Sequence, residues 1–237
     1  MATTLSVSTT DGEMPLYEAE PDGPARAAVV VIQEAFGVNG HIEDVTRRFA
    51  EAGYRAVSPH LFHRSRDPVL GYGDFGNVMP HMQALNEAGL VSDLDATLGH
   101  LSAAGFEPPR VGIVGFCMGG TVAFLAATRY PLGAAVTFYG GGVTEGRFGM
   151  PSLVEIASDL QAPWLGLFGD LDQSIPVEDV ESLRAATTNA RVPTNIIRYP
   201  EAGHGFHCDA RDSYHQPSAT DAWQRTLDWF MRHLATS

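Results

Sequence analysis

Residues 111–120 read VGIVGFCMGG, and this stretch decides the expected fold. Its apolar start predicts a strand over 110–115, and the apolar run that follows predicts a helix over 118–129. Only small residues fit beside a turn this tight, which accounts for the glycines of the pattern G-x-C-x-G-G. Such a turn presents the side chain of Cys117 at a helix N-terminus, where amide groups and the helix dipole favour a thiolate and a developing oxyanion.

Two other interpretations of this turn stay open. Free cysteines are common in protein cores, so Cys117 could be a buried residue in a glycine-rich turn. A nucleotide-binding loop is the second alternative, although residues 115–120 lack the G-x-G-x-x-G pattern. The nucleophile interpretation is favoured, and it requires a base and an acid elsewhere in the chain.

Strand-like and helix-like segments alternate on both sides of this turn. Residues 27–33 (AAVVVIQ) form a continuous apolar run typical of a strand buried on both faces. We therefore expect an α/β fold over a single domain, 1–237, with a mostly parallel sheet, helices on both faces and sites at the carboxyl ends of strands. The other predicted elements are strands over 54–58, 134–139, 164–168 and 194–199, a hairpin over 5–8 and 16–19, helices over 42–52, 90–103, 177–190 and 219–234, and a loop over 67–77.

The composition excludes several classes of function. The chain has 237 residues, of which 44% are hydrophobic, enough to build a core. The formal net charge is −13, all 15 basic residues are arginine, and there is no lysine. A lysine Schiff base and a phosphate-loop lysine are therefore excluded, and the acidic chain lacks the basic field that nucleic-acid binding requires.

Membrane insertion and export are not expected either. The longest apolar runs, such as 27–32, are far too short to span a membrane, and the first 15 residues lack the basic and apolar regions of a signal peptide. We expect a cytoplasmic protein in which Cys117 and Cys208 stay reduced, because a reducing compartment is the default without an export signal. We expect no nucleic-acid or membrane partner, and a monomer or homodimer.

Two later strands are each followed by a candidate partner for the thiol. GDLDQSIP (169–176) and PEAGHGF (200–206) both come directly after a predicted strand. An acid and a histidine thus follow the cysteine in the order nucleophile, acid, histidine, which is the order of the α/β-hydrolases. The alternatives are that His204 is an ordinary turn residue and that Asp172 caps a helix.

The sequence resembles the dienelactone hydrolase (carboxymethylenebutenolidase) family of the α/β-hydrolase fold. The resemblance spans about 27–204 and is carried by QEAFGVN (33–39), GFCMGG (115–120) and EAGHGF (201–206), and the segment 172–176 also fits. A cysteine in the turn together with QE-x-FG-x-N makes the resemblance specific, because a serine hydrolase would have neither. The resemblance implies an α/β-hydrolase fold and the hydrolysis of a lactone or ester.

The family pattern implies roles for four side chains. Cys117 would attack the substrate, His204 would act as the base, and Asp172 would orient the histidine. Glu34 would contact the resting thiol and help ionise it when substrate binds, because a thiol with a pKa of about 8.5 is mostly protonated at neutral pH. Glu34 ends an apolar strand, where a buried carboxylate is costly, and a surface loop is its alternative place. Asp170 is the second candidate acid, but the family has the acid four residues before a proline, which selects Asp172.

The resemblance also implies the surroundings of the nucleophile. The backbone N–H groups of Met118 and Ala35 would stabilise the oxyanion. Aromatic side chains close to these segments are also explained by simple packing. The candidates for an apolar pocket are Phe36, Tyr139, Phe206 and Cys208.

The sequence departs from the family where a substrate carboxylate would bind. Founding members have an arginine four residues after the histidine, where this chain has Cys208, and another in the loop before the long helix, where residues 70–84 contain none. Arg64 and Arg66 could supply a substitute charge or be solvated loop residues. Without an arginine clamp, a preference for neutral lactones or esters over carboxylated dienelactones is expected.

The predicted chemistry requires neither a metal nor an organic cofactor. The pairs His60–His63 and His204–His207 have the spacing of metal ligands, but a third clustered ligand is missing. The sequence therefore predicts a cofactor-free hydrolase that cleaves a small-molecule lactone or ester through a Cys-His-Asp triad and a thioacyl enzyme. A thioesterase or general carboxylesterase on the same triad, and a non-catalytic binding protein of the same fold, are the alternatives.

Overall fold

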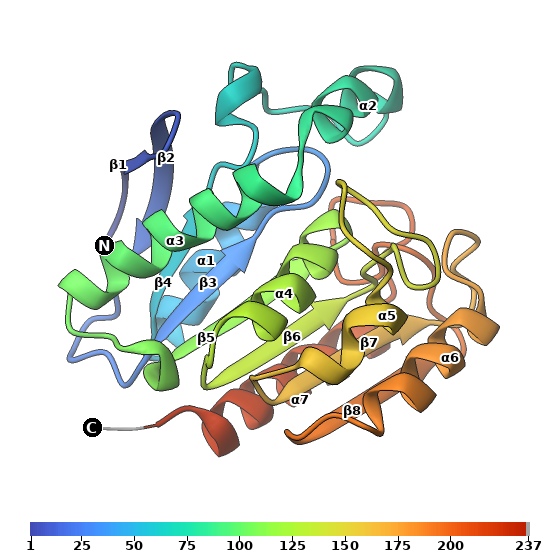
Figure 1. Ribbon diagram of the computed structural model, residues 1–237. Coiled ribbons are helices and arrows are strands. Elements are labelled where there is room, and N and C mark those ends of the chain that lie inside the picture. Colours follow the sequence, from blue (N-terminus) through green and yellow to red (C-terminus); the bar gives the residue numbers. More distant parts are fainter. Residues whose placement is uncertain (236–237) are drawn as a thin grey trace.

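The computed structural model describes residues 1–235, apart from the side chain of Phe75, and contains an eight-stranded sheet (Figure 1). The strands are β1 (Ala2–Thr9), β2 (Gly12–Ala19), β3 (Ala28–Ile32), β4 (Arg55–Pro59), β5 (Val111–Phe116), β6 (Ala134–Phe138), β7 (Trp164–Gly169) and β8 (Thr194–Tyr199). Their order across the sheet is β1-β2-β4-β3-β5-β6-β7-β8. The pairs β1–β2 and β2–β4 are antiparallel, and every pair from β4 to β8 is parallel, which confirms the mostly parallel sheet.

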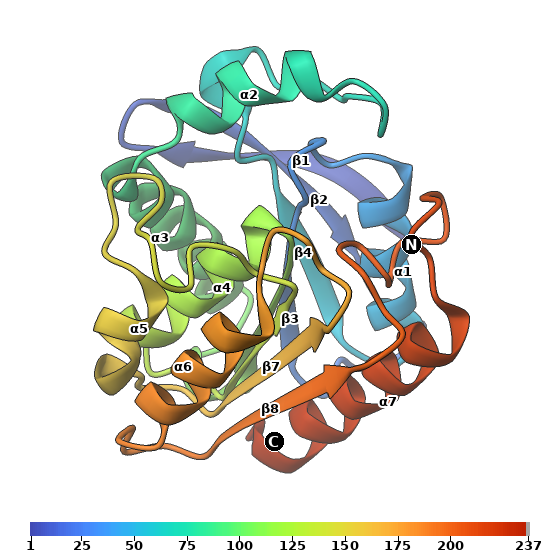
Figure 2. The same cartoon turned by 90° about the vertical axis from the view of Figure 1, so that its right-hand side faces the viewer.

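Helices cover both faces of this sheet, as an α/β fold requires. The helices are α1 (Gly40–Glu51), α2 (Phe75–Ala84), α3 (Glu87–Ala103), α4 (Met118–Arg129), α5 (Leu153–Ile156), α6 (Val177–Thr187) and α7 (Gln216–His233). Helices α3, α4, α5 and α6 lie on one face, and α1 and α7 lie on the other (Figure 2). Within residues 1–235, none of these helices has the length and apolar character that a membrane span needs.

The centre of the sheet is buried on both sides, which explains the continuous apolar sequences found there. All residues of β3, β5, β6 and β7 are buried, and so are the residues of α4 from Met118 to Thr128. Within this core, the indole N–H of Trp164 donates to Oγ1 of Thr137 at 3.0 Å. The segment that carries Cys117 is therefore anchored in the most completely buried part of the fold.

Two helices were not foreseen. The segment 67–77 was expected to be a loop, but α2 begins within it, at Phe75. The glycine-rich approach to α2 and Pro80 inside it both oppose a helix locally. The four residues of α5 are too few to display a helical period.

Other differences concern where elements begin and end. α3 begins at Glu87 rather than at 90, because the side chain of Asn86 accepts a hydrogen bond from the N–H of Gly89 at 3.0 Å and caps the helix. α6 ends at Thr187 rather than at 190, α7 begins at Gln216 rather than at 219, and both strands of the N-terminal hairpin are longer than predicted.

The turn between β5 and α4 leaves no room for side chains at its glycines. A Cβ atom on Gly115 would lie 1.9 Å from the carbonyl oxygen of Gly119, and one on Gly119 would lie 2.4 Å from that of Gln33. Cys117 has a φ of 55° and a ψ of −120°, a conformation that residues other than glycine rarely adopt. The close packing of α4 against β3 and β5 thus holds Cys117 in a strained turn, as the glycine pattern predicted.

Substitution of Gly115, which packs against the backbone of α4, should lower the stability of the protein far more than substitution of a glycine with free space around it. Gly115→Ala should destabilise the protein by more than about 3 kcal/mol or prevent folding, because the backbone atoms in contact cannot move aside. Gly99→Ala is the matched control. Nothing lies within 4 Å of a Cβ atom at Gly99 on α3, so alanine should stabilise the helix by about 0.5–1 kcal/mol. Urea unfolding followed by circular dichroism measures both, and wild-type stability of Gly115→Ala would contradict the packing.

Candidate active site

Loops at the carboxyl ends of three parallel strands bring Cys117, Asp172 and His204 together. Cys117 follows β5, Asp172 lies in the loop after β7, and His204 lies in the loop after β8. Nε2 of His204 is 3.1 Å from the sulfur of Cys117, and its Nδ1 is 2.6 Å from Oδ2 of Asp172. The histidine therefore bridges a thiol and a carboxylate, which is the relation that a nucleophile, its base and an orienting acid require.

The carboxylate of Asp172 is held by its own loop. Its Oδ1 accepts hydrogen bonds from the backbone N–H and the hydroxyl of Ser174, at 2.8 and 2.7 Å. Burial alone would raise the pKa of Asp172, but the hydrogen bonds from His204 and Ser174 lower it, so the group stays ionised. The second candidate, Asp170, instead binds the guanidinium of Arg198 through both oxygens, at 2.7 and 2.8 Å. Of the two acids, Asp172 is the one that lies against the histidine.

His204 is placed to hold a proton at neutral pH. Burial would lower its pKa, but the sulfur of Cys117 and the carboxylate of Asp172 outweigh burial and raise the pKa to about 10. An imidazolium next to a sulfur atom favours the thiolate over the thiol. The arrangement thus places a proton donor directly beside a potential anionic nucleophile.

Two backbone segments meet at the N-terminal end of α4. Met118 is the first residue of α4, where N–H groups have no acceptor within the helix. Ala35 lies just beyond β3, on the segment whose Gln33 carbonyl approaches the same helix end. Both Met118 and Ala35 are buried. These positions suit the expected oxyanion hole, which stays a prediction.

Glu34 is buried, so the surface-loop alternative for it is wrong. Its side chain has no exposed surface, and its Oε1 accepts from Nη1 of Arg211 at 3.2 Å and from the hydroxyl of Tyr139 at 3.4 Å. Its Oε2 is buried and has no hydrogen-bond partner among the described residues. The expected contact with the resting thiol is not seen as a hydrogen bond within residues 1–235, where the sulfur of Cys117 pairs with His204.

Arg211 is a cation in the site that the sequence analysis missed. Its side chain is 14% exposed, and its guanidinium carbon lies 5.7 Å from the ring centre of Phe36 and 5.8 Å from that of Tyr72. It follows His204 by seven residues rather than four, in an irregular loop whose side-chain directions have no period. The glycine at position 205 is the sequence feature related to this arginine, because a Cβ atom there would lie 2.3 Å from Nη1 of Arg211. The glycine after the histidine therefore makes room for this arginine.

The two arginines considered as substitutes are placed differently. The guanidinium of Arg64 donates to the carboxylates of Asp11 and Asp93, and Arg66 is an exposed turn residue with a φ of 70°. The expectation of neutral substrates rested on a missing arginine. Arg211 removes that premise, because the site does contain a largely buried guanidinium.

The candidate pocket residues divide between the site and the core. Phe36 contacts the guanidinium of Arg211, and Tyr139 hydrogen bonds to its carboxylate partner. Phe206 is fully buried and lies 5.3 Å from the ring of Tyr139, so packing explains its place. Cys208 is also fully buried.

The histidines with metal-ligand spacing have separate neighbours. Nδ1 of His60 lies 2.7 Å from Asp67, and Nε2 of His63 lies 3.1 Å from Asp93. His207 is buried among aromatic rings, and burial keeps its pKa well below the ordinary value. The members of each pair therefore do not share a partner.

Comparisons with known proteins identify relatives along nearly the whole chain. The sequence profile of the dienelactone hydrolase family matches residues 14–234. A protein of Yersinia pestis named "Putative carboxymethylenebutenolidase" is 43% identical over 227 residues, which cover 93% of this chain and 84% of that protein. A protein of the same name from Escherichia coli (strain K12) is 41% identical over 96% of this chain and 86% of its own length.

A solved structure is similar over the whole length of the chain. The crystal structure of a "Putative Dienelactone Hydrolase" from Klebsiella pneumoniae has a TM-score of 0.89 and 40% identity, and the match covers 98% of both chains. Since the family profile matches nearly the whole chain and relatives exceed 40% identity, this chain belongs to the dienelactone hydrolase family and is a hydrolase of the ester or lactone type.

Proposed function

We propose that this hydrolase opens a lactone through Cys117, His204 and Asp172, with a thioacyl enzyme as the intermediate. The observation that carries the proposal is the hydrogen-bonded row from sulfur to imidazole to carboxylate. The raised pKa of His204 and the strained backbone of Cys117 support it, because both features are concentrated at functional sites.

In the first half of the reaction, the thiolate of Cys117 attacks the carbonyl carbon and a C–S bond forms. The N–H groups of Met118 and Ala35 would donate to the oxygen that becomes negatively charged. The ring C–O bond then breaks, and the imidazolium of His204 gives its proton to the leaving oxygen. The product is a ring-opened thioester on the enzyme, and Asp172 keeps the imidazole in the required tautomer.

In the second half, water replaces the leaving oxygen. The neutral imidazole of His204 takes a proton from the water as its oxygen attacks the thioester carbon. The C–S bond breaks, the carboxylic acid leaves, and Cys117 and His204 return to their starting charges. No step requires a metal or an organic cofactor.

The buried pair of Glu34 and Arg211 supports an acidic substrate. A guanidinium binds carboxylates strongly, so a substrate carboxylate would compete with Glu34 for Arg211. Glu34 would then keep only the hydroxyl of Tyr139 as a donor and become a stronger proton acceptor. It could then accept the proton of any Cys117 that is still a thiol. In this proposal, binding of an acidic substrate helps to activate the nucleophile.

The proposed substrate class is therefore a lactone that carries a carboxylate, such as a carboxymethylene butenolide. Two observations support it: the presence of Arg211 beside the site and the names of the relatives from Yersinia pestis and Escherichia coli. Neutral aryl esters and acyl thioesters test the wider esterase and thioesterase alternatives. A panel of these substrates at equal concentration should give the highest kcat/KM for the carboxylated lactone.

The two aspartates of the 169–176 loop should respond very differently to substitution. Asp172→Asn should lower kcat by roughly 10³-fold or more, because an amide cannot stabilise the imidazolium. Asp170→Asn, the matched control, loses only a partly exposed ion pair with Arg198 and should leave kcat within about twofold. Steady-state hydrolysis of one lactone measures both, with Cys117→Ala giving the background rate. The reverse order of effects would show that the acid is Asp170.

The two cysteines should differ sharply in reactivity. Cys117 is partly accessible and lies next to an imidazolium, whereas Cys208 is fully buried and burial raises the pKa of its thiol to about 11. At pH 7, iodoacetamide should therefore alkylate Cys117 first. Because the pKa of His204 is raised to about 10, its positive charge is present at pH 7 and is lost as the pH rises through about 10. His204→Gln removes this charge and should slow alkylation of Cys117 at pH 7 by roughly tenfold or more and change its pH dependence.

Peptide mass spectrometry after timed quenching gives the alkylation rate of each cysteine. Equal rates for Cys117 and Cys208, or an unchanged pH profile in His204→Gln, would contradict the proposed activation of the sulfur.

Arg211 should determine the preference for substrate charge. Arg211→Gln should lower kcat/KM for a carboxylated lactone by about 10- to 150-fold, which corresponds to the loss of one charge-assisted hydrogen bond. For the methyl ester of the same lactone, kcat/KM should change by less than about threefold. Arg66→Gln is the matched control, since Arg66 is exposed in a loop. An equal loss on both substrates would mean that Arg211 is structural, and a wild-type preference for the ester would restore the neutral-substrate expectation.

A further inference from the structure

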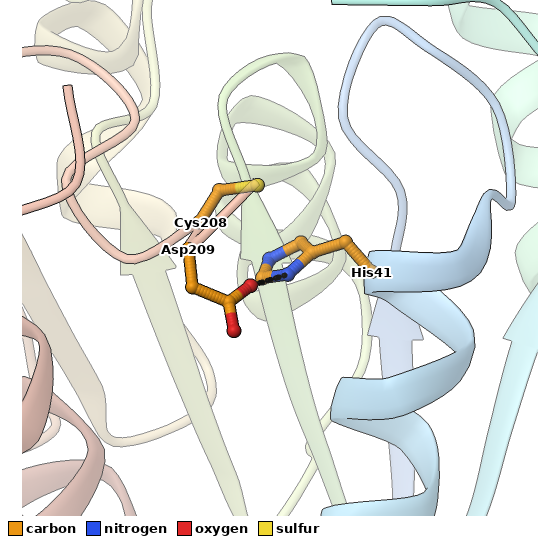
Figure 3. A group of neighbouring side chains, drawn as sticks. All are labelled: His41, Cys208 and Asp209. Carbon is orange, nitrogen blue, oxygen red and sulfur yellow. Dashed lines mark ion pairs between the residues drawn. The ribbon is translucent and has the colours of Figure 1, made fainter. Parts of the chain in front are cut away.

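The loop after His204 returns to the N-terminus of α1 and gathers His41, Cys208 and Asp209 (Figure 3). The imidazole of His41 extends from α1 toward the other two side chains. One donor atom from each residue lies within 4.8 Å of the donors of the other two, and Nδ1 of His41 is 3.6 Å from Oδ1 of Asp209. A thiol, an imidazole and a carboxylate thus converge in a cluster that contains none of Cys117, His204 and Asp172.

His41 presents its Nδ1 to this cluster. Its side chain is 4% exposed, and Nδ1 faces Oδ1 of Asp209 at 3.6 Å. Its other ring nitrogen, Nε2, is buried with no hydrogen-bond partner among residues 1–235. Nδ1 is therefore the nitrogen that a metal ion in this cluster would bind.

Cys208 has a polar neighbour that could support a metal-bound sulfur. Its S–H donates to the hydroxyl oxygen of Tyr72 at 3.2 Å, and that oxygen also accepts a hydrogen bond from Nδ2 of Asn39 at 3.1 Å. Once a metal ion has replaced the thiol proton, the hydroxyl of Tyr72 can donate its own proton to the sulfur. A neighbouring donor of this kind orients a metal-bound thiolate and stabilises its charge.

We propose that His41, Cys208 and Asp209 form a binding site for a divalent transition-metal ion of the Zn²⁺ type. Sulfur, imidazole nitrogen and carboxylate oxygen are the ligands of Zn²⁺, and three of them with a water molecule complete a tetrahedron. Binding replaces the S–H bond of Cys208 by a metal–sulfur bond and releases the proton to solvent. The site differs from the Cys117–His204 pair, and occupancy is not a step of the reaction.

The dimensions of the cluster allow a metal ion to bind after small movements of its ligand atoms. Ligand atoms of a tetrahedral Zn²⁺ site lie about 3.5 Å apart, as follows from bond lengths of about 2.0–2.3 Å. The His41–Asp209 distance already matches, and the remaining separations have to close by about 1 Å. Asp209 is 74% exposed, so its carboxylate can move and opens the site to solvent. The net charge of −13 attracts cations in general.

Titration of the intact protein with Co²⁺ tests the proposal, because cobalt bound to a thiolate gives a charge-transfer band in the near ultraviolet. The wild type should show the band with one Co²⁺ per chain, and Zn²⁺ should displace the cobalt. The band should persist in Cys117→Ser and disappear in Cys208→Ser. Asp209→Asn should weaken binding by roughly tenfold or more, whereas the matched control Asp212→Asn, an exposed acid of the same loop, should bind as the wild type does.

The Co²⁺ titration can overturn the proposed metal site in several ways. Absence of a thiolate band in the wild type would overturn the proposal. A band that is lost in Cys117→Ser and kept in Cys208→Ser would also overturn it, because the metal would then sit on the proposed catalytic pair. Should Cys208→Ser fail to fold, Asp209→Asn is the variant that decides, since the exposed Asp209 tolerates an amide. Equal affinities of Asp209→Asn and Asp212→Asn would then count against the site.

Discussion

The architecture around the site depends on how closely the N-terminus of α4 approaches the ends of β3 and β5. Carbonyl oxygens occupy the space that side chains would need at Gly115 and Gly119, so only glycine allows the contact. The short turn that results holds Cys117 at a positive φ, at the N-terminus of α4. On the same side of β5 as β6, the loops after β7 and β8 carry Asp172 and His204, and the histidine links the carboxylate to the sulfur.

Charge is distributed within the site in two separate groups. His204 bridges Cys117 and Asp172, while Glu34 is neutralised by Arg211. Burying a lone carboxylate would be costly, and the pair of Glu34 and Arg211 reduces that cost only while both partners stay together. A ligand that binds Arg211 therefore leaves Glu34 buried without its counter-charge. This coupling explains why Glu34 influences the reaction in our proposal although no hydrogen bond is seen between Glu34 and the sulfur within the described residues.

The sequence allowed the sheet, the sharp turn and the places of Cys117, Asp172 and His204 to be predicted, because these features are local: apolar runs, glycine spacing and residues directly after strands. Arg211 could not be predicted in this way. It reaches the site from an irregular loop, and only its contact with Gly205 marks its direction. The start of α2 was missed because the glycines before it and Pro80 inside it disfavour a helix locally. Loop geometry, rather than the order of residues, therefore decides where Arg211 lies.

In the proposed mechanism, the acyl group rests on Cys117 during turnover. Rapid mixing with a lactone, an acid quench within the first turnover and mass spectrometry of the intact protein would detect this intermediate. A lactone opens without losing a leaving group, so we expect an adduct with the full mass of the substrate, located on the peptide that contains Cys117. Turnover with no covalent adduct, or with the adduct on another residue, would show that Cys117 is not the nucleophile.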